Sequence, residues 1–153
     1  MARVPRGPPT GHEFLSHTAD IQVAAWAPTL EALFREAALV LARVMVPEPA
    51  IALEREIKVV TEAEDLKAAL FDWLTEVLFY SDSELFVLGD VDVKSVERLP
   101  GDKYRVTSTF KGETFKKGHH VPGREVKAIT YSYMTIEKNG KDGTYRLNII
   151  FDI

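Results

Sequence analysis

The stretch TLEALFREAALVLARVMVP, residues 29–47, carries the clearest structural pattern in the chain. Its apolar residues recur at steps of three and four, which is the period of one face of an α-helix. Thr29 is a suitable N-cap, and Pro47 cannot continue a helix. The sequence therefore predicts a helix between these two residues. Its apolar face consists of Leu30, Leu33, Phe34, Ala37, Ala38, Leu41, Val44 and Met45.

A second stretch, residues 66–78, repeats the same period and predicts a second helix. Thr61 and Glu64 have the spacing of a capping box, in which each side chain bonds the other residue's amide, so we expect the helix to begin near them. Both apolar faces are broad, which indicates helices that pack against a core. The second face consists of Leu66, Ala69, Leu70, Trp73, Leu74, Val77 and Leu78.

Most of the remaining sequence alternates between apolar and polar residues, which predicts strands. Two turns suit hairpins: LPGDKY at residues 99–104 and KNGKDGT at residues 138–144, where Asn139-Gly140 tolerates positive φ. We predict an α+β fold whose two helices cover one face of a largely antiparallel sheet. The expected strands lie around residues 21–25, 51–53, 57–59, 91–93, 104–108, 126–132 and 145–151.

Length and composition favour one folded domain. The chain has 153 residues, of which 46% are hydrophobic, enough for a packed core. The net charge of −4 argues against a domain built mainly to coat phosphate backbones. The absence of cysteine excludes disulfides, thiolate zinc sites and cysteine nucleophiles. No glycine-rich phosphate loop and no serine at a strand–turn–helix elbow is present.

The first twelve residues are rich in proline and glycine, which predicts a disordered tail before a single domain over residues 13–153. They lack the apolar stretch of a signal peptide, and no segment of the chain is apolar enough to span a bilayer. We therefore expect a soluble, cytoplasmic protein without a membrane partner.

Two acidic residues raise the question of a metal site. Asp20, in the polar cluster SHTAD, opens the first predicted strand, and Asp152 closes the last one. If these strands are neighbours, the carboxylates meet and repel unless a proton or cation lies between them. The carboxylate of Ile153 would add oxygen, and His17 could orient a ligand. Such a set favours calcium or magnesium. Spacing alone is explained more simply by a turn or bulge cap at Asp20 and a solvated strand end at Asp152.

The segment KKGHHVPGREVKA, residues 116–128, holds the other candidates. Adjacent residues on a strand point to opposite faces, so His119 and His120 are expected to chelate poorly. Its basic residues could contact phosphate or an acidic partner, although a solvated loop explains them as well. Lys127 alternates out of phase with its apolar neighbours and could face the acidic site, or it could simply face solvent.

Four segments in this order resemble the archease family: HTADI, LFDWLTEVLFYSDSE, GREVKAITY and the final FDI. The resemblance spans residues 13–153. It implies a duplicated strand–helix–strand–strand fold, with a sheet wrapped around two helices. It also implies a non-catalytic accessory protein of the GTP-dependent tRNA-splicing RNA ligase, which joins a 3′-phosphate or 2′,3′-cyclic phosphate to a 5′-hydroxyl. The accessory protein promotes ligase guanylylation and multiple turnover. It acts on tRNA indirectly, through the ligase.

The resemblance also implies site residues. Asp20, Asp152 and a main-chain or terminal oxygen of Ile153 carry over as calcium ligands, and Lys127 matches the motif as a partner contact. Relatives often carry histidine after the TY of this motif, where this chain has Ser132, so that position receives no role. Two other functions stay open: a small metal-dependent phosphoester hydrolase, and a chaperone that binds RNA directly.

Overall fold

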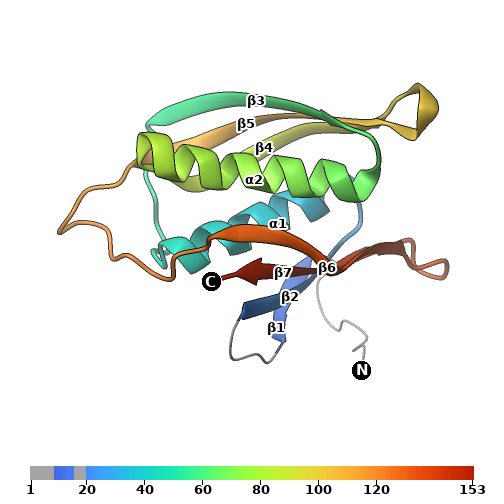
Figure 1. Cartoon of the computed structure of the whole chain (residues 1–153), viewed down its shortest axis with the longest axis horizontal. Coiled ribbons are helices and arrows are strands. Elements are labelled where there is room, and N and C mark those ends of the chain that lie inside the picture. The colour runs from blue at the N-terminus through green and yellow to red at the C-terminus, as the bar shows by residue number, and fades with distance from the viewer. Residues whose placement is uncertain (1–8, 16–19) are drawn as a thin grey trace.

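A computed structural model describes residues 9–15 and 20–153 of the chain. These residues form two α-helices and two sheets, and Figure 1 shows the helices lying between the sheets. The elements in chain order are β1 (Gly11–Leu15), β2 (Asp20–Ala27), α1 (Leu30–Met45), β3 (Arg55–Ala63), α2 (Leu66–Glu84), β4 (Phe86–Arg98), a 3₁₀ turn η1 (Pro100–Asp102), β5 (Tyr104–Thr114), β6 (Ala128–Lys138) and β7 (Tyr145–Asp152).

Helix α1 begins and ends where its sequence predicts. The hydroxyl of Thr29 accepts a hydrogen bond from the Ala32 amide at 3.1 Å, which satisfies one of the free donors of the first turn. The last helical residue is Met45, and the Val46 amide closes the end by donating to the Ala42 carbonyl. The predicted apolar face is buried in the core, except for its two ends, Leu30 and Val44–Met45, which are partly buried.

Helix α2 begins one turn later than the predicted capping box. Its N-cap is Asp65, whose carboxylate accepts a hydrogen bond from the Ala68 amide at 2.8 Å. Thr61 lies within β3, opposite Val106 of β5. The capping-box prediction was wrong because Thr61 pairs in a strand, so its amide is not the first donor of a helix.

The strands form two antiparallel sheets, in the orders β1-β2-β7-β6 and β3-β5-β4. Two strand–helix–strand–strand units account for both orders apart from β1, which pairs with β2 at the edge of the first sheet: β2, α1, β6 and β7 form the first unit, and β3, α2, β4 and β5 form the second. In each unit the first strand pairs with the third, and the last two form a hairpin. The second unit is inserted between α1 and β6 of the first, so the predicted duplication is present but nested.

The helices lie between the two sheets, where the residue pattern alone predicted that they cover one face of a single sheet (Figure 1). Residues 51–53 were expected to form a strand, but only β3 lies between the helices. Ile51 and Leu53 instead pack over Gly89 of β4, where an added Cβ would meet their side chains at 2.9 Å. The glycine permits this close approach at an irregularity in the β4–β5 pairing.

Both predicted hairpins are confirmed, joining β4 to β5 and β6 to β7. The positive φ of the second hairpin falls on Gly143 rather than on Asn139-Gly140. Strand β1 was not predicted, and it starts at Gly11, inside the stretch expected to be a tail. No helix among the described residues is both long and apolar enough to cross a membrane.

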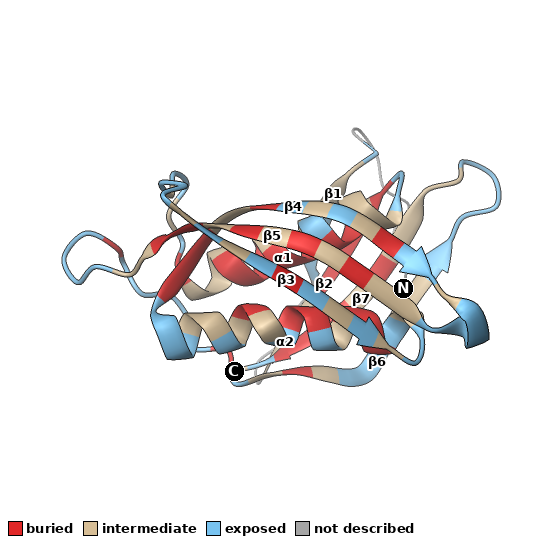
Figure 2. Cartoon of the chain, turned by 90° about the horizontal axis from the view of Figure 1, so that it is seen from above, coloured by how far each residue is buried: buried red, intermediate tan, exposed pale blue. Residues whose placement is uncertain are grey.

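The core between the sheets is centred on Trp73 of α2, which is fully buried. Its indole N–H donates to the Ser108 hydroxyl at 2.8 Å, and that hydroxyl donates to the Val59 carbonyl at 2.9 Å. This chain ties α2 to β5 and β3 and leaves no buried polar atom of the trio unsatisfied. Buried and less buried residues alternate along β5 above it (Figure 2). The core thereby fixes the register of the strands and determines which face of each strand is buried.

Candidate metal centre at the ends of strands β2 and β7

The two predicted acidic ligands lie directly opposite each other. Asp20 is the first residue of β2, Asp152 is the last residue of β7, and the antiparallel register pairs them. Residues paired in this way project from the same face of a sheet with Cβ atoms about 4.5–5.5 Å apart. Asp152 is exposed and Asp20 is partly exposed. The fold therefore joins carboxylates that are 132 positions apart in the sequence.

The core sets this register. Along the same ladder Val23 lies opposite Ile149 and Ala25 opposite Leu147, and all four are buried. Because side chains alternate between the faces of a sheet, these buried pairs place both aspartates on the opposite face of the sheet. A slip of one residue would turn every buried side chain outward. The position of Asp152 is thus determined by apolar residues far from it.

The other predicted site residues differ in how they relate to this acidic pair. The Lys127 amide donates to the Asp152 carbonyl at 2.8 Å, so the backbone of the β6 segment holds the end of β7. The Lys127 side chain is exposed. Ile153 follows Asp152 directly and packs its side chain against the core. His17 lies outside the described residues.

The donor set suits a hard cation. Carboxylate and main-chain oxygens are the ligands that calcium and magnesium prefer, and neither thiolate nor described imidazole belongs to this pair. Two like charges placed directly opposite each other cost stability unless a cation or proton reduces their repulsion. The residues present at the corner therefore fit the calcium ion that the sequence resemblance implies.

A second cluster of ligand-type side chains lies away from this corner. Glu113, His119 and His120 bring potential ligand atoms within 4.8 Å of one another. The histidines were expected to point apart, as on a strand. They instead lie in a turn in which both of their amides donate to the Lys116 carbonyl, so their rings come to 4.6 Å between centroids. Sequence spacing could not reveal this turn.

Hydrogen bonding makes this cluster structural. The Lys116 amide donates to Nδ1 of His120 at 2.8 Å, so Nδ1 is unprotonated and Nε2 carries the proton of a neutral ring. Nε2 lies 3.2 Å from Oε2 of Glu113, and both side chains are buried. A metal ion on Nε2 would have to replace that proton while Nδ1 stays an acceptor, which requires an imidazolate. We therefore assign the pair to packing.

Glu113 also holds the segment before β3. The Ala52 amide donates to Oε2 of Glu113 at 2.8 Å. This backbone hydrogen bond, helped by His120 and opposed by burial, keeps the pKa of Glu113 below its usual value. A hydrogen bond to the charged carboxylate stabilises it and therefore favours ionisation. The buried acid thus joins three segments: residues 48–52, β5 and the turn at residues 116–120.

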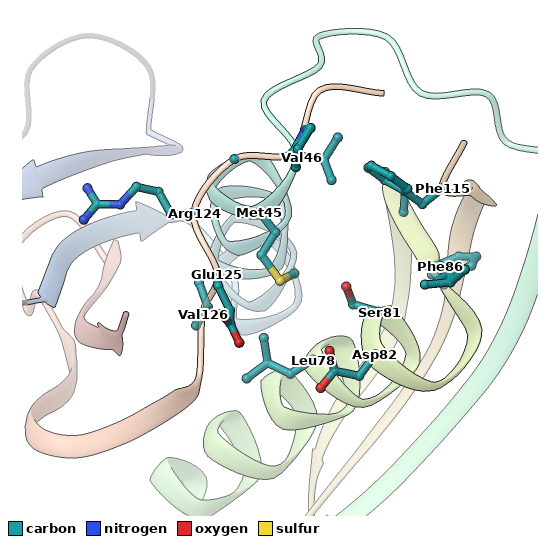
Figure 3. Close-up of a pocket in the computed structure, with 14 residues that line it drawn as sticks. Met45, Val46, Leu78, Ser81, Asp82, Phe86, Phe115, Arg124, Glu125 and Val126 are labelled. Carbon is teal, nitrogen blue, oxygen red and sulfur yellow. The ribbon is translucent and has the colours of Figure 1, made fainter. Parts of the chain in front are cut away.

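An open, largely apolar cavity of about 240 Å³ lies where the ends of α1 and α2 meet residues 122–126. Figure 3 shows Met45, Leu78 and Phe86 around it, with the side chain of Arg124 pointing away. The amides of Gly123 and Arg124 donate to the Met45 and Val44 carbonyls, which satisfies free carbonyls at the end of α1. The cavity combines three distant segments, so no sequence motif indicates it.

Fold and corner together define the class of protein: a small α+β domain of two nested strand–helix–strand–strand units, with a carboxylate pair where the first unit closes. The chain belongs to the archease family, because the model of the Archease protein family (MTH1598/TM1083) matches residues 12–153. The match covers both units, the acidic pair and Lys127. The family resemblance inferred from the sequence is thus confirmed.

Individual relatives agree with this assignment. Protein archease of Pyrococcus furiosus is 40% identical over 141 residues, which cover 92% of this chain and 97% of the relative. Protein archease-like of Drosophila melanogaster is 29% identical over 146 residues, covering 95% and 92%. The solution structure of Methanobacterium thermoautotrophicum protein 1598 superimposes with a TM-score of 0.80 at 33% identity, covering 94% of this chain and 99% of that one.

Proposed function

We propose that this chain is an accessory protein of the GTP-dependent tRNA-splicing RNA ligase and acts through a calcium ion at its acidic corner. The ligase joins a 3′-phosphate or 2′,3′-cyclic phosphate to a 5′-hydroxyl, and the accessory protein promotes its guanylylation and repeated turnover. Membership of the archease family supports the role. The observation that carries the site is the direct pairing of Asp20 with Asp152.

In this proposal the chain's own residues hold and present the ion. Asp20 and Asp152 supply carboxylate oxygens and Ile153 a main-chain oxygen, while the β2–β7 ladder fixes their spacing. A bound calcium ion supplies positive charge and takes six to eight oxygen ligands, more than this chain offers. Water, or an oxygen of the ligase or of a phosphate that it holds, would fill the remaining positions.

The corner would act on the conformational equilibrium of the ligase. A protein that binds one ligase state better than another shifts the population toward that state. The corner is suited to this because it lies at the exposed end of a rigid ladder. The amide of Lys127 keeps β7 in place there, and its exposed side chain is available for a partner contact.

The test is ligation of 3′-phosphate RNA by the cognate ligase at substrate excess, with and without this protein. We expect the wild type to raise the number of turnovers and Asp20→Ala and Asp152→Ala to abolish the increase. Asp92→Ala, an exposed aspartate on β4, is the matched control. Full stimulation by both corner variants would refute the role of the corner. Hydrolysis of a phosphoester by this protein alone would instead favour the hydrolase alternative.

A further inference from the structure

Strand β6 is interrupted beside the acidic corner. Between Thr130 and Thr135 strand β6 advances five residues while β7 advances two, so the pairing of β6 with β7 contains a large bulge. Within the bulge Tyr133 has a φ of 58° and is 83% exposed. An aromatic residue in the left-handed region is strained, and such strain collects at functional sites. The fold thus presents a bare tyrosine ring to solvent at a cost in stability.

A second aromatic residue of the bulge is held in a fixed orientation. Tyr131 stacks on Phe71 of α2 with ring centroids 4.4 Å apart and planes 5° apart. Phe71 covers one face of the ring, yet Tyr131 remains 51% exposed. A tyrosine fixed in this way offers contact area with little rotamer entropy left to lose on binding. Tyr131 and Tyr133 are therefore suitable anchors for a partner.

The surroundings of Tyr131 are acidic. Burial raises the pKa of Tyr131, and the charges of Asp72, Asp65 and Glu64 raise it further. Helix α2 contains one lysine, Lys67, and four acidic residues. Of these, Asp72 and Glu76 border an open groove between α2 and β3, which the exposed ring of Phe79 also lines. Neither forms an ion pair with any residue in the described parts of the chain.

We propose that these residues form a docking surface for a basic, arginine-bearing segment of the ligase, an inference that rests on the proposed function. The acidic–aromatic face, as we call it, consists of Phe71, Asp72, Glu76, Phe79, Tyr131 and Tyr133. A guanidinium stacks on tyrosine and phenylalanine rings and pairs with carboxylates. An enzyme that handles RNA carries basic surfaces of this kind. The same carboxylates repel phosphate, so RNA itself does not fit this face.

The face and the corner can engage one partner together. Ala128 of β6 lies opposite Asp152, and Tyr131 follows three residues later on the same strand. Three residues of extended chain span about 10 Å. The face would therefore supply affinity while the acidic corner reaches the part of the ligase that it activates.

Three variants separate these contributions. Tyr133→Gly removes the ring and also relieves the positive φ, so the fold is preserved. Asp72→Lys/Glu76→Lys reverses the charge of the groove. Glu54→Lys/Asp92→Lys makes the same charge change at exposed positions outside the face and is the control. Each variant is titrated into the ligation reaction at substrate excess, and its binding to immobilised ligase is measured.

We expect Tyr133→Gly and Asp72→Lys/Glu76→Lys to raise the concentration for half-maximal stimulation by about tenfold or more without changing the maximum. The control should stay within about twofold. Asp20→Ala should lose the stimulation but keep the binding, which separates the two sites. The inference is overturned if the face variants match the control, or if the wild type binds tRNA alone and Tyr133→Gly does not. A wild type that neither binds nor stimulates the ligase overturns the proposed function as well.

Discussion

The two units close their sheets at equivalent corners with opposite electrostatics. In the first unit the start of β2 meets the end of β7, and two aspartates lie opposite each other. In the second unit Arg55 opens β3, and its guanidinium contacts the Thr114 hydroxyl at 3.0 Å, at the end of β5. The same guanidinium pairs with Glu84 at 2.7 Å. The first corner places two like charges opposite each other. In the second, which we call the neutralised corner, Arg55 and Glu84 form a pair of opposite charges.

We propose that the difference separates a corner that serves stability from one that serves binding. Next to Thr114 in β5 stands the buried Glu113, whose carboxylate accepts from the Ala52 amide and lies 3.2 Å from Nε2 of the buried His120. In the first corner two carboxylates lie directly opposite each other, an arrangement that a bound cation would stabilise. Comparing the two units thus points to the acidic corner without reference to any relative.

The largest effect should come from calcium, which should stabilise the protein only through the acidic corner. A ligand that binds the folded state alone adds about 2.7 kcal/mol at about a hundred times its dissociation constant. We expect calcium to raise the melting temperature of the wild type and to leave Asp20→Asn and Asp152→Asn unchanged. Thermal unfolding with calcium, with magnesium and with chelator measures this.

The matched control for calcium is Glu84→Gln, which removes a carboxylate from the neutralised corner. It should melt at a lower temperature than the wild type but keep the full calcium shift. If the corner variants kept the shift while Glu84→Gln lost it, the assignment of the two corners would have to be exchanged.

The next effect should come from Glu113 in the neutralised corner. Glu113→Ala leaves the Ala52 amide without an acceptor and removes the carboxylate that lies 3.2 Å from the buried Nε2 of His120, which should cost about 1–3 kcal/mol of unfolding free energy at neutral pH. Urea denaturation measures the loss. Glu56→Ala, an exposed glutamate of β3, should change the unfolding free energy far less.

The contribution of Glu113 should also depend on pH. Its folded pKa is lowered, so the stability that it adds is present above its unfolded pKa of about 4.3 and is lost as the pH falls through the folded value. We expect the difference in unfolding free energy between wild type and Glu113→Gln to shrink across this window. Parallel curves for the two proteins would show that the ionised carboxylate adds nothing.

Local patterns predicted much of the fold. The period and N-cap of α1, both hairpins and the α+β class follow from residues that are close in sequence. The nested order of the units does not, because it depends on which distant strands pair. The same limit explains Thr61: a threonine three residues before a glutamate suits a capping box, but pairing with Val106 in β5 decides its structure. Tertiary contacts override local propensity at such positions.

The candidate site, like the fold, could be predicted only in part from the sequence. Asp20 and Asp152 could be suspected from their strand-end positions, but spacing alone could not establish that the strands are neighbours. The acidic–aromatic face could not be predicted at all. Tyr131 and Tyr133 look like ordinary strand residues, and only the bulge in β6 leaves both exposed. The irregular backbone of β6, which packs next to α2 of the other unit, gives no periodic pattern in the sequence.

The smallest effect tests the repulsion itself. Like charges directly opposite each other on a sheet are destabilising by about 0.2–1 kcal/mol, and solvent exposure keeps the value low. In chelator, Asp152→Asn should therefore raise the unfolding free energy slightly, whereas Glu84→Gln should lower it because Arg55 loses its partner. Urea denaturation of both variants at low and high salt measures this, and the gain in Asp152→Asn should shrink with salt. A loss of stability in Asp152→Asn would mean that the carboxylate forms a favourable contact in the metal-free protein. The corner would then resemble its counterpart in the second unit, and the contrast between the two would no longer identify a binding site.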